Sequence, residues 1–361
     1  MSQQNSKPQS ELTQWLNQHA SELDAGGDAR HQLLSTLAES GLFRIGVPAK
    51  FGGDGQPIFA AADAIADVAR HSLTAAFVAW GHRTLIDYLV QSPNSELARR
   101  WLPQLLSGHV AGATALSNAM KYLSGIEAIQ ISATPDDNGW ILNGKLFWVT
   151  NLDPKGFLVA AIVQNTETGT PAIVAIDSRS AGVKRSDNLN LVALRGSSTA
   201  ALQLDSVHIS ENDIIHLDAK HFCPAIRPHF LGLQCGMSIG HVRASLDTIS
   251  AHVSRPGRDY LQAELDGLQQ QLDKHINTLQ QGLANGTFAE VPARLFQLRI
   301  DLAGLVQLAA NSELEASGGS AYLLDPHNGF ERRWREAAFI PVVSPSVSQL
   351  KGELAKQAGA A

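Results

Sequence analysis

The hydrophobic pattern of this chain changes its period twice, and no other feature of the sequence constrains the fold as strongly. Up to about residue 108 the apolar residues recur at the spacing of helices, and from about 109 they alternate. After about residue 217 the helical spacing returns. We therefore expect an α+β protein with three domains, at 1–108, 109–217 and 218–361.

Helical patterns fill most of the first domain. The stretches SELTQWLNQHASEL, IFAAADAIADVARHS and LTAAFVAWGHRTLIDYLV each place apolar residues on one face. A further helix is predicted from Asp28 to Gly41. The segment LFRIGVPAKFGGDGQP interrupts the period with two prolines and four glycines, so we expect a structured loop there.

Strand signals replace the helical ones in the middle domain. The segments AIQISATP and GWILNGKLFWVTN flank the turn DDNG, and three more apolar runs follow. The dipeptide Asn143-Gly144 is of the kind that a two-residue type I′ hairpin prefers, because both central residues need a positive φ. Five or six short strands without crossover helices predict an antiparallel barrel or sandwich.

Three long helical segments are predicted after residue 218. They begin at HFLGLQCGMSIG, at DYLQAELDGLQ and at VPARLFQLRID, and each extends beyond twenty residues. Helices of this length bury their apolar stripes against one another and against partner subunits. We therefore expect a four-helix-bundle-like domain and a homodimer or homotetramer.

Composition and charge exclude several classes of protein. The 28 Lys and Arg against 34 Asp and Glu give a net charge of -6, without a basic stripe, so nucleic acid is not expected as a partner. Cys223 and Cys235 fit no disulfide framework or zinc-ligand spacing, which predicts reduced structural thiols and no metal. No stretch approaches the ~18 apolar residues of a membrane span, and the amino terminus lacks an apolar signal region. A cytoplasmic location is expected.

Four strings in order along the chain resemble segments of the acyl-CoA dehydrogenase family. They are LAESGLFRIGVPAKFGGDG, NGKLFWVTN, LVALRGSSTAALQLDSVHI and EASGGSAYLLDPHNGFERRWREAA. The order and spacing of the four carry the resemblance, which covers nearly the whole chain. It implies the fold of this family and a flavin-dependent oxidoreductase that acts on CH–CH groups. The implied substrate is a small molecule, with acyl thioesters among the candidates.

The resemblance also implies where FAD, or FMN in its place, would bind. In NGKLFWVTN, Trp148 and Thr150 would face the isoalloxazine ring. The backbone that would run along the pyrimidine edge of the ring belongs to Thr114, Ala115 and Leu116.

Further along the chain, Gly318 and Gly319 would let the backbone approach the cofactor closely. Glu315 stands where the family usually has a Gln, and SNAMKYLSG stands in place of the T-E-P-x-x-G-S-D stretch that helps to hold the pyrophosphate. The Arg-x-x-Phe-Gly segment that normally reaches a neighbour's adenosine diphosphate is replaced by SRPGRDYL, which leaves Arg255 or Arg258 as substitutes.

The catalytic carboxylate of the family is missing. In most members a Glu follows the R-D-A motif by seven positions, and the matching residue here is Ser344, followed by Pro345. No Asp or Glu occurs between Ala337 and Lys351. The alternative Glu position, at the start of the first long C-terminal helix, also lacks an acid. His229 lies beside it and is interpreted as a partly exposed residue at a helix start.

Three functions remain open from the sequence. The first is an acyl-CoA dehydrogenase-like flavin oxidoreductase that does not dehydrogenate acyl-CoA, because a serine hydroxyl cannot replace the carboxylate at Ser344. The second is a flavin-dependent monooxygenase of the same fold, with His82 in the region that lines the substrate cavity of such enzymes. The third is a catalytically silent homologue that binds a partner or serves as a scaffold.

Overall fold

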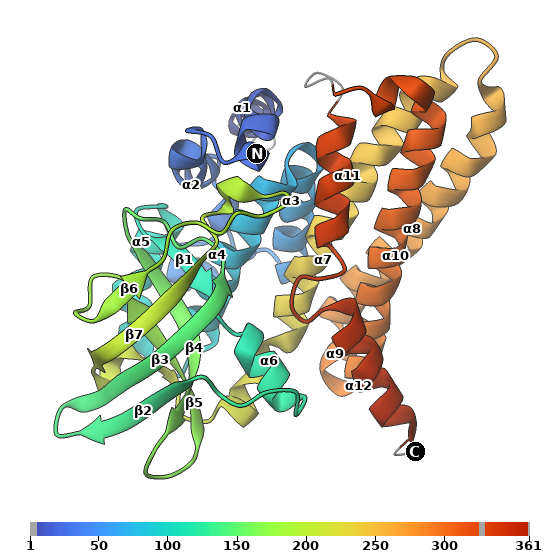
Figure 1. Cartoon of the computed structure of the whole chain (residues 1–361). Coiled ribbons are helices and arrows are strands. Elements are labelled where there is room, and N and C mark those ends of the chain that lie inside the picture. The colour runs from blue at the N-terminus through green and yellow to red at the C-terminus, as the bar shows by residue number, and fades with distance from the viewer. Residues whose placement is uncertain (1–5, 325–328, 360–361) are drawn as a thin grey trace.

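A computed structural model of the chain describes residues 6–324 and 329–359. Figure 1 shows the sheet on one side of the molecule and the long C-terminal helices on the other. The elements before the sheet are α1 (Ser6–Ala25), α2 (Arg30–Glu39), η1 (Leu42–Arg44), η2 (Ala49–Phe51), α3 (Ile58–His71), α4 (Leu73–Gln91) and α5 (Ser95–Leu106). The predicted helix from Asp28 to Gly41 is therefore present as the shorter α2, which Gly41 follows in a left-handed conformation with φ 82°.

One eight-stranded sheet forms the middle of the described chain, with the strand order β6-β7-β3-β2-β4-β5-β8 and β1 paired to β4. The strands are β1 (Ala111–Thr114), β2 (Ile131–Asp136), β3 (Gly139–Val149), β4 (Phe157–Asn165), β5 (Pro171–Asp177), β6 (Val183–Arg185), β7 (Ala200–Ile209) and β8 (Ile214–His216). The short helical elements between them are α6 (Ser117–Leu123), η3 (Arg195–Ser197) and η4 (Glu211–Asp213).

The sheet is mixed, and the prediction of an entirely antiparallel barrel or sandwich is wrong in this respect. Both β1 and β2 run parallel to β4 and pair with successive parts of it, whereas the other pairs are antiparallel. Alternation of apolar residues predicts which face of a strand is buried but carries no information about strand direction. The α+β class and the helix–sheet–helix order are confirmed.

The dipeptide Asn143-Gly144 lies inside β3, so the hairpin predicted there is wrong. The other turn predicted here, DDNG, is confirmed: Asp137 and Asn138 connect β2 to β3. A register irregularity separates Leu142 from Gly144, whose φ is 146°. An added Cβ at Gly144 would lie 2.2 Å from the Gln130 carbonyl oxygen, so the glycine allows a close strand approach.

The C-terminal part contains the three predicted long helices, and α7 alone has 35 residues. Its elements are α7 (Ala219–Val253), η5 (Asp259–Leu261), α8 (Gln262–Ala284), α9 (Thr287–Glu290), α10 (Pro292–Ser317), η6 (Gly318–Tyr322), α11 (Phe330–Phe339) and α12 (Val347–Gly359). Glycines allow α7 to pack closely on α3, because added Cβ atoms at Gly236 and Gly240 would lie 2.3 and 2.0 Å from the carbonyl oxygens of Ala62 and Ala66.

Two hydrophobic cores hold the molecule together. One core joins the helices before and after the sheet, and the other lies within the sheet. Alternate residues of β4 belong to the two cores: Leu158 and Ala160 pack with the helices, whereas Val159 and Ala161 pack inside the sheet. The predicted domain limits stay a prediction, since the first and last groups of helices share one core.

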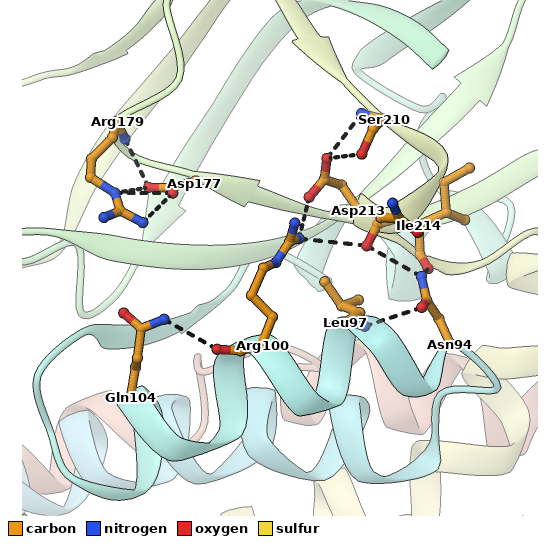
Figure 2. A network of polar contacts seen from close by, with 10 residues as sticks. Asn94, Leu97, Arg100, Gln104, Asp177, Arg179, Ser210, Asp213 and Ile214 are labelled. Carbon is orange, nitrogen blue, oxygen red and sulfur yellow. Dashed lines mark hydrogen bonds and ion pairs between the residues drawn. The ribbon is translucent and has the colours of Figure 1, made fainter. Parts of the chain in front are cut away.

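A polar network fastens α5 to the end of the sheet (Figure 2). Asn94 caps α5 by accepting from the Leu97 amide, and its side-chain nitrogen donates to the Ile214 carbonyl at 2.9 Å. Arg100 forms an ion pair with Asp213, as Figure 2 shows. The α5 helix therefore has a fixed position against β8 without contributing to the site described below.

Cys223 and Cys235 are both free thiols and both buried. Burial raises the pKa of each thiol to about 12. The prediction of reduced thiols is confirmed. Within residues 6–324 and 329–359, every helix is too short or too polar to cross a membrane.

Candidate functional site

Ser344 lies in the segment between α11 and α12, where it forms hydrogen bonds with residues of two other elements. Its Oγ accepts a hydrogen bond from the Ser117 hydroxyl of α6 at 3.1 Å. Its carbonyl accepts from Gln234 Nε2 of α7 at 3.0 Å. Because Ser117 directly follows Leu116, the structure brings the predicted flavin-edge segment next to the position of the missing base.

A buried polar pair, which the sequence prediction missed, stands behind Ser344. Arg299 of α10 donates from Nε to Gln234 Oε1 at 2.7 Å and from Nη2 to the Ile340 carbonyl at 2.6 Å. Neither Gln234 nor Arg299 has exposed surface. The sequence did contain a signal: Gln234 and Arg299 stand within the largely apolar strings FLGLQCGM and LFQLRIDLAG, whose residues are expected to be buried.

A small pocket with a volume of about 90 Å³ lies near this pair, and its lining includes Leu231 and Phe296, three residues before Gln234 and Arg299. We name it the α6–α12 pocket. Its lining residues are Met120, Leu123, Ser124, Arg227, Leu231, Phe296, Pro345, Gln349, Leu350, Glu353 and Gln357. Pro345 directly follows Ser344, so the pocket adjoins the position of the missing base. Six of these side chains are apolar and five are polar or charged, so the pocket offers both apolar contact and hydrogen-bonding groups.

Four aromatic side chains fill the space between α4, the α7 segment RPHFLGLQ and the end of α11. Phe77 and Trp80 of α4 stack with ring centroids 5.7 Å apart. Trp80 also packs on Phe230 at 5.3 Å, and Phe77 meets Phe339 edge-on at 4.7 Å. We name these four residues the aromatic cluster. Phe77, Trp80 and Phe230 are buried, so this space is occupied by the chain itself.

His82 is buried, and both of its ring nitrogens bind backbone. Nε2 pairs with the Leu105 carbonyl at 2.9 Å, and Nδ1 accepts from the Gly112 amide at 2.8 Å. This pairing requires the neutral imidazole with its proton on Nε2. Burial lowers the pKa of His82 to about 4. These hydrogen bonds make His82 a structural residue that links α4 to β1, and neither ring nitrogen is left for proton transfer.

His229 is the eleventh residue of α7, and the prediction that it stands at a helix start is wrong. Its Nδ1 lies 3.0 Å from the buried Asp87 carboxylate of α4 and 3.1 Å from Gln91 Nε2. Burial alone would lower the pKa of His229, but the charge and hydrogen bond of Asp87 outweigh it and raise the pKa. Arg83 lies 4.0 Å from the same carboxylate. This group joins α4 to α7.

Trp148 is exposed at the end of β3, in an unusual backbone conformation. The β3–β7 register shifts between Leu146 and Val149, and Trp148 has φ 62°. Positive φ is strained for a bulky residue. The irregularity turns the indole out of the sheet, so that 66% of the residue is exposed.

Thr150 and the end of β1 are buried and hydrogen-bonded within the chain. Thr150 Oγ1 donates to the Ser197 carbonyl at 3.3 Å. The Ala115 amide donates to the Ala160 carbonyl, and Thr114 Oγ1 lies 3.2 Å from the Tyr88 hydroxyl. Leu116 is also buried, and its amide lies 3.5 Å from the Thr114 hydroxyl oxygen. These groups therefore already form hydrogen bonds within the chain.

Gly318 and Gly319 lie at the far end of α10. An α-helix rises about 1.5 Å per residue, so the end of α10 is about 27 Å along its axis from Arg299. Added Cβ atoms at both glycines would meet nothing within 4 Å. The chain itself does not bring these glycines to Ser344. Among residues 6–324 and 329–359, no group of three metal-ligating side chains gathers to hold a metal ion.

Comparison with known proteins relates this arrangement to one family. Residues 10–109 match the family model described as acyl-CoA dehydrogenase, N-terminal domain. The mitochondrial isovaleryl-CoA dehydrogenase of Arabidopsis thaliana is 28% identical over 191 residues, which make up 52% of this chain and 46% of that protein. The chain spans about half the length of the curated relatives it matches.

Solved structures extend the similarity to the whole fold. Glutaryl-coenzyme A dehydrogenase, in complex with glutaryl-CoA, superposes with a TM-score of 0.80 at 18% identity, covering 97% of this chain and 94% of that one. The chain therefore has the fold of acyl-CoA dehydrogenases, and residues 10–109 match the N-terminal-domain model of that family. A dibenzothiophene monooxygenase from Paenibacillus sp. A11-2 has a TM-score of 0.76 at 18% identity, with 96% and 94% covered. Identity this low shows a common fold only.

Members of the acyl-CoA dehydrogenase family are FAD-binding flavoproteins. The exposed Trp148 indole suits the flat ring of a flavin, since aromatic faces stack on one another. The segment in place of the pyrophosphate stretch uses its polar groups internally: Asn118 donates to Glu127 and to the Ala128 carbonyl, both at 2.9 Å. The described residues therefore fit the ring of a flavin through Trp148, and we find no corresponding fit to its phosphates.

Proposed function

We propose that this chain is a flavin-dependent oxidoreductase of the acyl-CoA dehydrogenase family that does not dehydrogenate acyl-CoA thioesters. The observation that carries the proposal is the surroundings of Ser344. Its hydroxyl is hydrogen-bonded to another hydroxyl, that of Ser117, and its carbonyl to a neutral amide, that of Gln234. A carboxylate base is absent from residues 337–351.

Dehydrogenation of an acyl thioester needs a base that removes the α-proton. A positioned acid–base group contributes ~10²–10⁴ in rate, and its pKa must lie near the working pH. A serine hydroxyl has a far higher pKa and no histidine contact in the described structure. Ser344 therefore cannot do the work of the family's glutamate.

The aromatic cluster supports the same proposal independently. It occupies the space between the segments that the family resemblance assigns to substrate and base, on α4, α7 and the end of α11. Trp80 and Phe230, at the centre, are 4% and 2% exposed. A long acyl chain would have to displace these rings, and the packing of protein interiors resists such displacement.

Trp148 supports the flavin part of the proposal. When bound, a flavin would supply a two-electron acceptor for hydride. The chain would contribute the indole face that orients the ring. The monooxygenase was favoured by the missing carboxylate and by His82, and the two backbone hydrogen bonds of His82 leave only the first of these in its support. The monooxygenase therefore ranks second, and the silent homologue third. The cytoplasmic location stays a prediction.

A homodimer or homotetramer is part of the proposal. Leu308, Tyr322, Leu323 and Trp334 are large apolar residues with 43–86% of their surface exposed. Leu308, Tyr322 and Trp334 lie on α10, η6 and α11, which contact one another, and Leu323 directly follows η6. Exposed apolar surface of this kind is typical of subunit interfaces. Sedimentation of a 38.6 kDa monomer at micromolar concentration would contradict this part.

The decisive experiment mixes the flavin-loaded protein anaerobically with saturated acyl-CoAs of several chain lengths and follows the visible flavin band. We expect no bleaching, and the same result for Ser344→Ala, because the serine is not a base. Dithionite must bleach the band in the same cuvette. Rapid bleaching by any acyl-CoA would refute the proposal, and protein purified without a flavin that rebinds none would favour the silent homologue. Oxygen uptake by the reduced protein with an aromatic or sulfur substrate would favour the monooxygenase.

A further inference from the structure

Arg299 is a buried cation to which the described residues offer only neutral hydrogen-bond acceptors. These acceptors are the Gln234 side chain and the Ile340 carbonyl. Nη1 is buried without a hydrogen-bond partner in the part of the chain that the structure describes. Burial lowers the pKa of Arg299 to about 10, so the guanidinium still carries its charge at neutral pH.

Two other buried arginines of this chain, unlike Arg299, lie near a carboxylate. Arg83 lies 4.0 Å from the Asp87 carboxylate, and Arg332 lies 2.8 Å from that of Glu336. Burying a charge is costly unless a partner of opposite sign compensates it. Arg299 lacks such a partner within residues 6–324 and 329–359, and it keeps two N–H groups of Nη1 unused. An anion from outside the chain would supply the missing negative charge and the hydrogen-bond acceptors for Nη1.

The place for this anion follows from the helix geometry. Side chains on an α-helix lean toward its N-terminus, so Gln234 and Arg299 lie over the preceding turns of α7 and α10. Those turns contain Leu231 and Phe296, which line the α6–α12 pocket. Gln234 also holds the carbonyl of Ser344, whose neighbour Pro345 lines the same pocket. The buried cation therefore lies about one helical turn from the lining of the pocket, without itself lining it.

The other charges at the pocket leave it positive. Arg227 lines the pocket, with its guanidinium 5.7 Å from the centroid of the Phe296 ring. Glu353 also lines it and attracts Arg227, but this carboxylate also forms an ion pair with Lys356 at 3.0 Å. Arg227 and Arg299 together exceed the remaining negative charge, and a partly enclosed site strengthens their attraction for an anion.

We propose that the α6–α12 pocket binds a small carboxylate and that Arg299 is its buried counter-charge. Ser344 Oγ accepts the proton of Ser117, so its own proton can be donated to a carboxylate oxygen. Arg227, which lines the pocket, is the second cation available to the ligand. The volume of about 90 Å³ is about three times the share of one water molecule in the liquid, which limits the ligand to a few heavy atoms. This inference goes beyond the proposed function, because it needs neither flavin nor turnover.

The test measures the melting temperature and the heat of binding of the full-length protein with sodium propionate at low ionic strength. Propionamide, which has nearly the same shape but no charge, and sodium chloride at matched concentration are the controls. We expect propionate alone to raise the melting temperature in a saturable way. Arg299→Met should weaken propionate binding at least tenfold, and Arg299→Lys should retain part of it.

Two further variants keep the test decisive. Arg227→Gln changes only the lining of the pocket, so it should fold even if Arg299→Met does not, and it should also weaken propionate binding several-fold. Arg99→Gln, at an exposed arginine of α5, removes the same charge elsewhere and should leave binding unchanged. An equal temperature shift with propionate and chloride, or equal propionate affinity in Arg227→Gln and Arg99→Gln, would overturn the proposal.

Discussion

Replacing Trp80 by alanine should destabilise the protein without affecting flavin retention. Replacing Trp148 by alanine should weaken flavin retention and leave the stability nearly unchanged. The two tryptophans are the same side chain in opposite settings. Trp80 is 4% exposed in the aromatic cluster, whereas Trp148 is 66% exposed at the end of β3. The pair therefore separates a structural role from a cofactor role with matched chemistry.

The magnitudes follow from these surroundings. Truncation of a buried tryptophan to alanine costs about 3–5 kcal/mol of unfolding free energy. Trp80→Ala also removes the hydrogen bond from Nε1 to the Phe230 carbonyl, which is 3.3 Å long. Trp148→Ala should change stability by less than about 0.5 kcal/mol, as surface substitutions do. The lost ring stacking of about 0.5–1.5 kcal/mol should weaken flavin binding by roughly two- to tenfold.

Urea unfolding of the flavin-free proteins, followed by circular dichroism, measures the stability, and a fluorescence titration measures flavin affinity. The Trp80→Ala protein should bind indole in the new cavity, so indole should raise its melting temperature and leave that of the wild type unchanged. The reasoning fails if Trp80→Ala costs under about 1 kcal/mol and gains nothing from indole. Unchanged flavin affinity in a folded Trp148→Ala protein would remove Trp148 from the cofactor site.

Two other predictions concern packing and pH. Gly240→Ala places a Cβ 2.0 Å from the Ala66 carbonyl oxygen, so it should lower the free energy of unfolding by about 1–3 kcal/mol. The control Gly304→Ala, on the exposed side of α10, should raise it by about 0.5–1 kcal/mol. Equal effects of the two variants in urea unfolding would contradict the close α3–α7 contact. Because the pKa of His229 is raised, its ion pair with Asp87 stabilises the fold fully below pH 6.5 and weakens as the pH rises through the raised pKa of His229. Because the pKa of Asp87 is lowered, the stabilisation is lost at acid pH only below 3.8. The stability deficit of His229→Gln should thus be largest between these two values and shrink above neutral pH, and a deficit independent of pH would argue against the ion pair.

The order of elements could be predicted from the sequence because it depends on local periodicity. The strand β4 carries an uninterrupted apolar pattern, and α7 appears as a long helix after the sheet, although it begins ten residues before the expected start at His229. Strand direction and the role of Asn143-Gly144 depend on neighbours that are distant in sequence. Asn143 Oδ1 accepts from the Ser206 amide at 2.8 Å, a contact between β3 and β7 that no local rule for turns describes.

The candidate site was predictable only in part, for the same reason. Ser344 could be found by counting from a motif, since its position relative to α11 is local. Arg299 could not, because its meaning depends on which residues of α7 and of the 340–344 segment it meets. A lone arginine in an apolar stripe can have a carboxylate partner on any neighbouring helix. Only the structure shows that its hydrogen bonds go to neutral groups, Gln234 and Ile340.

Serine at position 344 and arginine at position 299 are electrostatically consistent with each other. A glutamate at position 344 would lie close to the buried guanidinium, which is two hydrogen bonds away through Gln234. An opposite charge at short range lowers the pKa of a carboxyl group, and more strongly in a poorly solvated site. A carboxylate with a lowered pKa is a weaker proton acceptor, so this arginine would oppose α-proton removal even if the acid were restored. The same charge favours an anion bound at Ser344. Ser344→Glu alone should therefore not produce dehydrogenation, and it should abolish propionate binding by placing a permanent carboxylate where the ligand is expected.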